Sequence, residues 1–251
     1  MWLVLCSSLD SSGLWVYEGL RQLGVAPIEL VLSDWLAYGS VWEHRLDASG
    51  THLKITLPDG RVVCSSRVRG AINRLLMPAP GIAEQAAASD KEYAQAELQA
   101  FYLSWLNGLP GVVINRPTPI GLCGSWYHPS EWAYRASRAG LPVAAYRQSA
   151  HDAPDHCYRP RLPEGAARLN LIAFRGEVFG GERRERLPET LVRSCARLAA
   201  NAKAELLGIE LYAAEDGAWT FANATPCPDL SAGGKSLLQS LAQAMKDGGE
   251  S

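Results

Sequence analysis

The segment LGIELYAAEDGAWTFANATPCP, which spans residues 207–228, decides the fold of this chain. Its apolar run from Leu207 to Tyr212 predicts a buried strand, and Trp219 to Ala222 predicts an antiparallel partner. Asp216-Gly217 between the two runs is a dipeptide typical of a tight turn. The segment therefore predicts a β-hairpin, with Glu210 on one strand and Asn223 directly after the other.

Outward from this hairpin, short apolar runs alternate with helical patterns along the 251 residues, which predicts an α/β protein. The expected strands are Trp2 to Cys6, Pro27 to Leu32, Val41 to Leu46, His52 to Leu57, Arg61 to Cys64, Arg69 to Asn73, Val112 to Ile114, Pro142 to Tyr146, Arg168 to Phe174 and Glu177 to Phe179. The expected helices are Ser11 or Ser12 to Leu23, Ser89 or Asp90 to Leu106, Pro129 to Ala139, Pro188 to Leu206 and Lys235 to Met245. A Pro-rich segment separates two parts of this pattern, which predicts an α/β domain at 1–147, a connection at 148–167 and a C-terminal domain at 168–251.

The composition bounds the class of protein. With 47% hydrophobic and 20% charged residues, the chain is typical of a soluble globular protein. Its net charge of -2 provides no basic field for nucleic acid or for an anionic membrane. No run reaches the roughly 18 apolar residues of a membrane helix, and the first residues lack the basic region of a signal peptide. We therefore expect a cytoplasmic protein with reduced cysteines. The composition leaves open whether the chain forms a homodimer.

Several segments, taken in order, resemble the RimK-type branch of the ATP-grasp superfamily. Gly70-Ala71-Ile72-Asn73-Arg74 is similar to a strand of that family that ends in arginine, and Val113-Ile114-Asn115-Arg116-Pro117 is similar to its strand that ends in Asn-x-Pro. The hairpin of residues 207–228 resembles its metal-binding hairpin. Further similar segments are 90–93 with Glu97, 139–143 and 171–179. The resemblance implies a pre-ATP-grasp-like N-terminal domain, an ATP-grasp-like α+β C-terminal domain, and ATP-dependent joining of a carboxylate to an amine.

The chain departs from that family where the nucleotide is held. The resemblance implies a lysine-bearing subdomain of several dozen residues between Val143 and Leu171, yet this chain has a short Pro-rich segment there. Its five lysines leave the interval from Glu92 to Ala202 without any lysine. We therefore expect a reduced C-terminal domain that lacks the central nucleotide-lid subdomain.

The metal-binding hairpin departs from the family as well. The family pattern, an Asp on one strand and Glu-x-Asn-Pro on the next, corresponds here to Glu210 and to Asn223-Ala224-Thr225-Pro226. Mg²⁺ prefers carboxylate oxygens, and one carboxylate of two is left. Glu210 and Asn223 are therefore a degenerate candidate metal site, and we expect no bound cofactor.

Arginines near strand ends are the main candidates for ligand binding. In an open α/β sheet, ligands bind at the carboxyl ends of the strands, and guanidinium groups hold carboxylates or phosphates. The competing interpretation is that they are surface arginines with packed aliphatic stems. The full candidate set is Arg69, Arg74, Asn115, Arg116, Tyr127, His128 and Arg175.

Two functions are compatible with these features, and no residue is given a catalytic role. The first is a degenerate ATP-grasp-like protein without ligase activity, which binds a partner protein, a peptide or a small acidic ligand in an arginine-lined cleft. The alternative is a minimal carboxylate–amine ligase that uses ATP and Mg²⁺. In that alternative Arg147, Arg159 or Arg161 would replace the missing lysines, and Glu210 with Asn223 would hold the metal.

Overall fold

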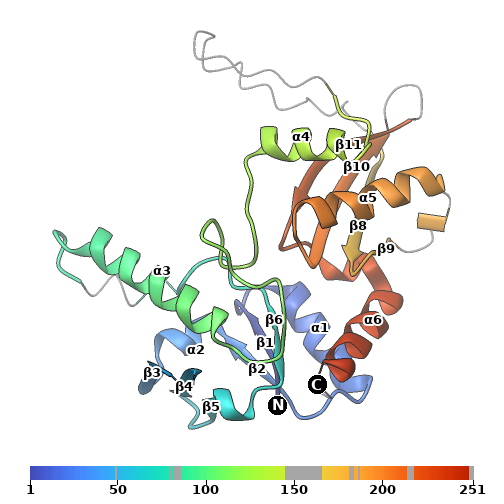
Figure 1. The fold of residues 1–251 in the computed structure, drawn as a ribbon. Helices are drawn as coiled ribbons and strands as arrows, with labels where there is room; N and C mark the ends of the chain where they lie inside the picture. The colour runs from blue at the N-terminus through green and yellow to red at the C-terminus, as the bar shows by residue number, and fades with distance from the viewer. Residues whose placement is uncertain are drawn as a thin grey trace. The chain divides into compact units, whose positions relative to one another are not determined.

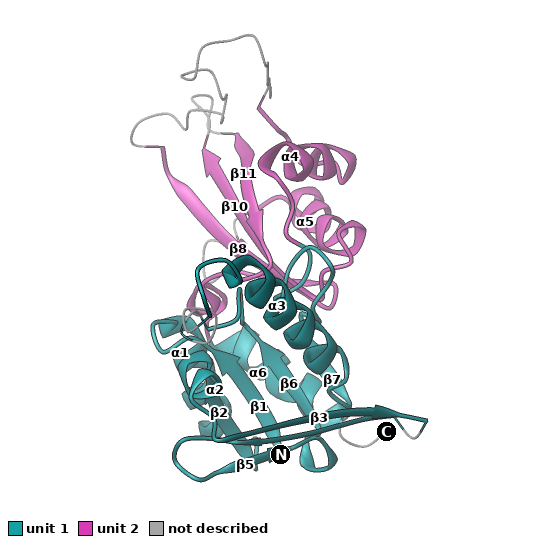
Figure 2. Cartoon of the chain, turned by 90° about the vertical axis from the view of Figure 1, so that its left-hand side faces the viewer, with its two compact units in different colours: residues 1–125, 235–251 teal, residues 126–234 magenta. Residues whose placement is uncertain are grey.

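In the computed structural model, the described residues are 1–48, 50–79, 81, 86–144, 166–180, 184–185, 187–213 and 218–248. They form two compact units, unit 1 of residues 1–125 with 235–251 and unit 2 of residues 126–234 (Figure 2). Each unit has a sheet and a hydrophobic core of its own. The α/β class predicted from the sequence is confirmed.

Unit 1 is built on a parallel sheet of four strands with the order β2-β1-β6-β7 (Figure 2). These strands are β1 (Trp2–Cys6), β2 (Ile28–Leu32), β6 (Gly70–Asn73) and β7 (Val112–Ile114). Every residue of β1 is buried, as expected for a parallel strand that is covered on both faces. Leu3 and Leu5 share a core with α3 (Lys91–Asn107), whereas Cys6 lies against α1 (Ser11–Gln22). The short helix α2 (Ser33–Ala37) follows β2 directly.

The last helix, α6 (Gly234–Asp247), belongs to unit 1 rather than to the C-terminal unit. Leu238 of α6 packs so closely on Gly19 of α1 that a Cβ atom at Gly19 would lie 2.6 Å from Leu238 Cδ1. This close approach requires a residue without a side chain at position 19. The division therefore differs from the expected domains, which placed residues 168–251 together.

A second sheet in unit 1 is antiparallel and has the order β3-β4-β5. Its strands are β3 (Val41–Asp47), β4 (Gly50–Thr56) and β5 (Val62–Cys64), and a short 3₁₀ helix covers Ser65–Arg67. Trp42 of β3 packs on Phe101 and Trp105 of α3, with ring centroids 5.2 and 5.9 Å apart. Leu53 and Ile55 of β4 are buried in the same core, so this sheet is fixed to α3 by one apolar face.

Unit 2 contains an antiparallel sheet with the order β11-β10-β8-β9. Its elements are α4 (Pro129–Arg138), β8 (Arg168–Phe174), β9 (Glu177–Phe179), α5 (Glu189–Asn201), β10 (Leu206–Ala213), β11 (Trp219–Thr225) and a 3₁₀ helix at Leu230–Gly233. The predicted hairpin is confirmed, because β10 and β11 pair antiparallel. Trp132 of α4 and Leu198 of α5 share a core with Leu207 of β10. This packing explains why α4 belongs to unit 2, although the expected domain of residues 1–147 included it.

Helix α5 differs from its expected bounds at both ends. Pro188 precedes the helix as its N-cap instead of lying in the first turn, and the helix ends at Asn201 instead of near Leu206. The early end follows from Lys203, whose φ of 54° is in the left-handed region and cannot continue an α-helix.

The segment between the two expected domains is only partly described. The strand expected from Pro142 to Tyr146 is reduced, over its described residues, to a bridge between Val143 and Phe221. Residues 145–165 lie outside the described residues, so the expected loss of the nucleotide lid stays a prediction. Among the helices that are described, none has the length and apolar content needed to cross a membrane.

Candidate functional site

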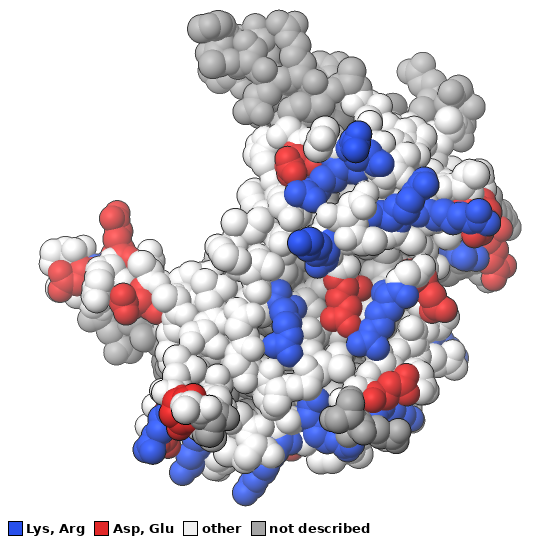
Figure 3. Space-filling view, in the orientation of Figure 1, with Lys and Arg blue, Asp and Glu red and all other residues white. Residues whose placement is uncertain are grey.

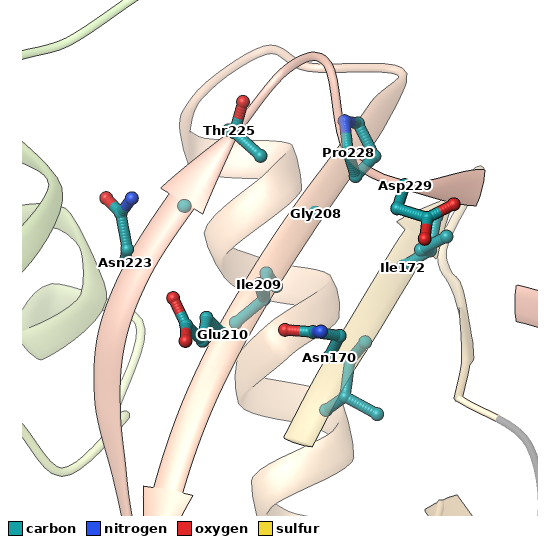
Figure 4. A pocket seen from close by; sticks show the side chains of 11 residues that line it. Asn170, Ile172, Gly208, Ile209, Glu210, Asn223, Thr225, Pro228 and Asp229 are labelled. Atoms are coloured by element: carbon teal, nitrogen blue, oxygen red, sulfur yellow. The ribbon is translucent and has the colours of Figure 1, made fainter. Parts of the chain in front are cut away.

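The candidate site is a cavity on one face of the unit 2 sheet, over β8, β10 and β11 (Figure 4). Side chains alternate along β10, so Leu207, Ile209 and Leu211 enter the core under α4 and α5. Gly208 and Glu210 face the opposite side. The cavity is lined by Asn170, Leu171, Ile172, Gly208, Ile209, Glu210, Asn223, Ala224, Thr225, Pro228 and Asp229.

Three polar side chains form a row across this face. The strand register places Glu210 of β10 opposite Asn223 of β11 and opposite Asn170 of β8. A β-bulge lies between Glu210 and Leu211, and bulges are frequent where a sheet must re-aim a side chain. Side chains that face each other across antiparallel strands lie close enough to contact one ligand together. Glu210 and Asn223, the predicted metal pair, are therefore side by side, and Asn170 joins them.

The Glu210 carboxylate already has a cationic partner. Arg168, at the start of β8, places its guanidinium 3.2 Å from Glu210 Oε1. The pair is partly exposed, so its contribution to stability is small. Its consequence for binding is larger, because the positive charge of Arg168 lies where a metal ion would need uncompensated negative charge.

The other end of the cavity is closed by apolar contacts and a helix cap. Pro228 packs on Gly208 so tightly that a Cβ atom there would lie 2.4 Å from Pro228 Cβ. Asp229 caps the following 3₁₀ helix, and its Oδ1 accepts hydrogen bonds from the amide and hydroxyl of Ser231 at 3.0 and 2.8 Å. Asp229 is thus the second carboxylate of the cavity, but one of its oxygens is engaged.

This donor set fits Mg²⁺ poorly. Mg²⁺ takes hard oxygen ligands in octahedral geometry and is usually held by carboxylates together with phosphates. Here the ligands would be one arginine-paired carboxylate, the Asp229 carboxylate with one oxygen engaged by Ser231, two amides and a hydroxyl. In the described part of the chain, no three His, Cys, Asp or Glu residues are grouped so as to hold a metal. The cavity volume of about 140 Å³ is also below the roughly 300–1,000 Å³ typical of small-molecule sites.

Arg74, one of the expected ligand-binding residues, is buried in an ion pair. Its Nε lies 2.6 Å from Asp10 Oδ2, and its second terminal nitrogen lies 3.0 Å from Asp10 Oδ1. Burial alone would raise the pKa of Asp10, but the hydrogen bond and charge of Arg74 and the amides of Gly13 and Ser12 outweigh it and lower that pKa. Asp10 also caps α1 by accepting a hydrogen bond from the Gly13 amide. Arg74 therefore joins the end of β6 to the start of α1.

Arg116 and Arg69 also have structural partners. Arg116 donates hydrogen bonds to the carbonyl oxygens of Asn107, Leu109 and Gly111, which lie at and after the end of α3. Arg69 precedes β6 and lies over the ring of Trp2, with its guanidinium carbon 5.6 Å from the ring centroid. Because Arg69 and Arg74 flank opposite ends of β6, the sheet does not bring them to one edge.

The other candidates also fill structural positions. The Asn115 carbonyl accepts a hydrogen bond from Asn73 Nδ2 at 3.0 Å, and its φ is 58°. His128 caps α4 by accepting from the Ser130 amide. The ring of Tyr127 lies 4.1 Å from the guanidinium carbon of Arg135. Arg175 at the β8–β9 turn pairs with Glu205 at 2.9 Å.

Sequence reasoning missed Arg168, Asn170 and Asp229 as site residues. Asn170 could have been found from its strand, because it interrupts an otherwise apolar run and occupies an alternate position with Arg168. Asp229 follows the Pro-Cys-Pro turn and has no comparable sequence signal. Its place in the cavity depends on the turn after β11, which brings it back over β8 and β10.

Comparison with sequences finds no matching family model and no matching curated protein. Comparison with solved structures finds ATP-grasp ligases. The macrocyclase MdnC of Microcystis aeruginosa MRC, bound with precursor peptide MdnA, matches with a TM-score of 0.69 at 11% identity, over 98% of this chain and all of its own. The ligase PsnB, complexed with a precursor variant, Mg and ADP, matches with a TM-score of 0.67 at 16% identity, over 98% of this chain and 97% of its own.

A third solved structure has a similar fold. The RiPP-associated ATP-grasp ligase of Chryseobacterium gregarium, in complex with ADP and a leader and core peptide, has a TM-score of 0.64 at 9% identity, over 98% of this chain and 95% of its own. At these identities the likeness concerns the fold. The chain therefore has the fold of ATP-grasp ligases along nearly its whole length.

Proposed function

We propose that this protein, which has the ATP-grasp ligase fold, binds a peptide and has lost ligase activity. The observation that carries the proposal is the Arg168–Glu210 pair, because it neutralises the carboxylate at the centre of the cavity. The neighbouring positions on β8 and β11 hold the neutral amides Asn170 and Asn223. A site of this charge has little attraction for the Mg²⁺ that must accompany ATP.

The phosphates of ATP would lack cations as well as metal. Ligation through an acyl phosphate requires positive groups that stabilise the phosphate oxygens. The cavity has no lysine among its described lining residues, and the sequence has none from Glu92 to Ala202. We attribute the missing phosphate-binding cations and the poor metal site to one history. In it, a chain related to the RimK-type branch degenerated and lost its nucleotide lid together with its metal site.

A peptide suits the groups that are present. Asn side chains donate and accept hydrogen bonds at once, which matches the alternating donors and acceptors of a peptide backbone. Three solved structures with this fold contain a precursor or leader peptide. A small acidic ligand is less well supported, because the expected arginines Arg74, Arg116 and Arg175 have partners, and Figure 3 shows several Lys and Arg side chains beside Asp or Glu.

The alternative proposal is a minimal ligase that uses ATP and Mg²⁺. The match to PsnB, whose structure contains Mg and ADP, favours this alternative. Arg147, Arg159 and Arg161, which would replace the lysines, lie outside the described residues. The two proposals differ in whether binding depends on MgATP, and both place the protein in the cytoplasm.

Binding to synthetic peptides tests the proposal directly. The probe is an array of random peptides of about twelve residues, with hits measured by fluorescence polarisation in the presence and absence of MgATP. We expect micromolar hits whose affinity MgATP does not change. Asn170→Ala should weaken them by about tenfold, because it removes a hydrogen-bonding amide from the cavity.

The matched control is Asn201→Ala, which removes an exposed asparagine at the end of α5 in the same unit. This control should bind like the unchanged protein. Absence of any hit would contradict peptide binding, and hits that require MgATP would support the ligase alternative instead.

A further inference from the structure

Strand β3 is an open edge of the three-stranded sheet. In the sheet order β4 lies between β3 and β5, and Figure 1 shows β3 on the outer side of this sheet. Among the described residues, no strand other than β4 pairs with β3. A seven-residue edge offers unpaired main-chain groups to another strand, and proteins usually protect such edges.

The register identifies which main-chain groups face outward. The Leu53 amide bonds to Ser65 Oγ and the Leu57 amide bonds to the Arg61 carbonyl, so the odd-numbered residues of β4 point toward β5. The Thr56 carbonyl bonds to the Ser40 amide, so the even-numbered residues of β4 point toward β3.

The odd-numbered residues of β3 are the register partners of those even-numbered residues of β4. The odd-numbered residues of β3 therefore bond inward, and the main-chain groups of Trp42, His44 and Leu46 point to the open edge.

The side chains near this edge include exposed apolar residues beside the charged ones. Leu46 is 65% exposed and Val41 is 45% exposed, although both are apolar and lie on an outer strand. On the α3 side, Trp42 and His44 are only partly covered and pack on Phe101. The edge thus exposes apolar area next to unpaired main-chain groups, as an interface between strands would.

The charges of β3 favour one partner. Glu43 and Arg45 flank His44 on the outer face and form an ion pair with each other. In an antiparallel pair of two identical strands centred on His44, Glu43 of each copy lies opposite Arg45 of the other. We propose that two copies of this chain associate through β3, antiparallel and centred on His44, to form a continuous six-stranded sheet.

Other centres of symmetry are less favourable. A pair centred on Glu43 would place two glutamates opposite each other, and a pair centred on Arg45 would place two arginines opposite each other. The pair centred on His44 also aligns Trp42 with Leu46 of the other copy on the α3 side, and it forms about six main-chain hydrogen bonds. The same sequence that leaves the edge open therefore selects a single register.

The histidine at the centre does not oppose this pairing. The Nε2 atom of His44 lies 2.9 Å from Ser104 Oγ on α3, and burial lowers the pKa of the imidazole. Burial therefore favours the neutral form of the ring. Glu43 and Arg45 on its own strand, and Leu53, its register partner on β4, add no unbalanced charge beside it.

The oligomeric state tests this proposal. We expect sedimentation velocity to show a dimer at micromolar concentration. Glu43→Arg and Arg45→Glu should each weaken it by about tenfold or more, because each places like charges opposite each other twice. An equal mixture of the two variants should form a heterodimer, since every position then faces an opposite charge again. Glu18→Arg, which breaks a comparable surface pair on α1, is the matched control and should stay dimeric.

Leu46→Pro provides a second variant that does not depend on charge. It removes an outward amide from an exposed position of an edge strand, where proline is tolerated, and should yield a folded monomer. A monomer at all concentrations for the unchanged protein would overturn the proposal, as would single variants that stay dimeric. A monomeric protein whose peptide hits are lost in Leu46→Pro would overturn it in favour of strand addition by a peptide.

Discussion

Asp10→Ala is expected to lower the free energy of unfolding by about 3–5 kcal/mol. The reason is that the variant leaves the guanidinium of Arg74 buried without its carboxylate partner, and the Arg74 side chain is only 6% exposed. The variant also removes the cap of α1 at the Gly13 amide. Urea denaturation of the two proteins measures the difference. If Arg74 instead served a ligand and needed no partner, the cost would stay near the roughly 1 kcal/mol of a lost cap.

The pair also predicts a pH dependence with a definite sign. Because the pKa of Asp10 lies below its usual value of 3.8 in the folded protein, the pair stabilises the protein above that value. This stabilisation is lost as the pH falls through the lowered pKa.

The matched control for Asp10→Ala is the double variant Asp10→Ala with Arg74→Met. It removes the buried charge as well and should regain part of the lost free energy of unfolding. A double variant no more stable than Asp10→Ala would contradict the explanation.

A variant with restored carboxylate charge is expected to bind metal at the hairpin. Asn223→Glu and Thr225→Asn reproduce the family pattern on β11, and Arg168→Ala frees the Glu210 carboxylate. The net charge of the cavity then becomes more negative by two. We expect the affinity for Tb³⁺, read from sensitised luminescence, to rise by about a hundredfold, because added ligand charge strengthens binding of hard cations.

The control for this gain is Asn201→Glu, which adds a carboxylate at the end of α5 on the exposed surface. It should leave Tb³⁺ binding unchanged. If the unchanged protein already binds Tb³⁺ at the hairpin as tightly as the triple variant, the Arg168–Glu210 pair does not block the site. The interpretation of the hairpin as a degenerate metal site would then be wrong.

The hairpin could be predicted from the sequence because its signals are local. Alternating apolar residues on both strands fix the faces, and the short connection fixes which residues lie opposite each other. The direct pairing of Glu210 with Asn223 did not follow from that register, because the β-bulge after Glu210 shifts the pairing by one residue. The neighbourhood of Asn170 did not follow either, because β8 joins β10 through contacts between distant segments.

The role of Arg74 could not be predicted for a similar reason. Its partner Asp10 is 64 positions away in the sequence. The rule that ligands bind at the carboxyl ends of strands suggested a ligand for Arg74, but that rule does not say which protein side chains already occupy the sheet edge. The partner of Arg116 is close in the sequence but was missed as well. The Arg116 side chain turns back along β7 and donates to the carbonyl oxygen of Gly111, which precedes that strand. Charged residues near strand ends are thus weak evidence for ligands until their partners are known.

Titration calorimetry with MgATP tests the central claim most directly. For the unchanged protein we expect no binding tighter than about 1 mM, which corresponds to roughly -4 kcal/mol. The claim would be contradicted by tighter binding that disappears in Glu210→Ala and persists in Glu177→Ala, a control at the exposed start of β9. Such a result would mean that the hairpin holds MgATP despite Arg168, and the protein would then be a ligase of minimal size.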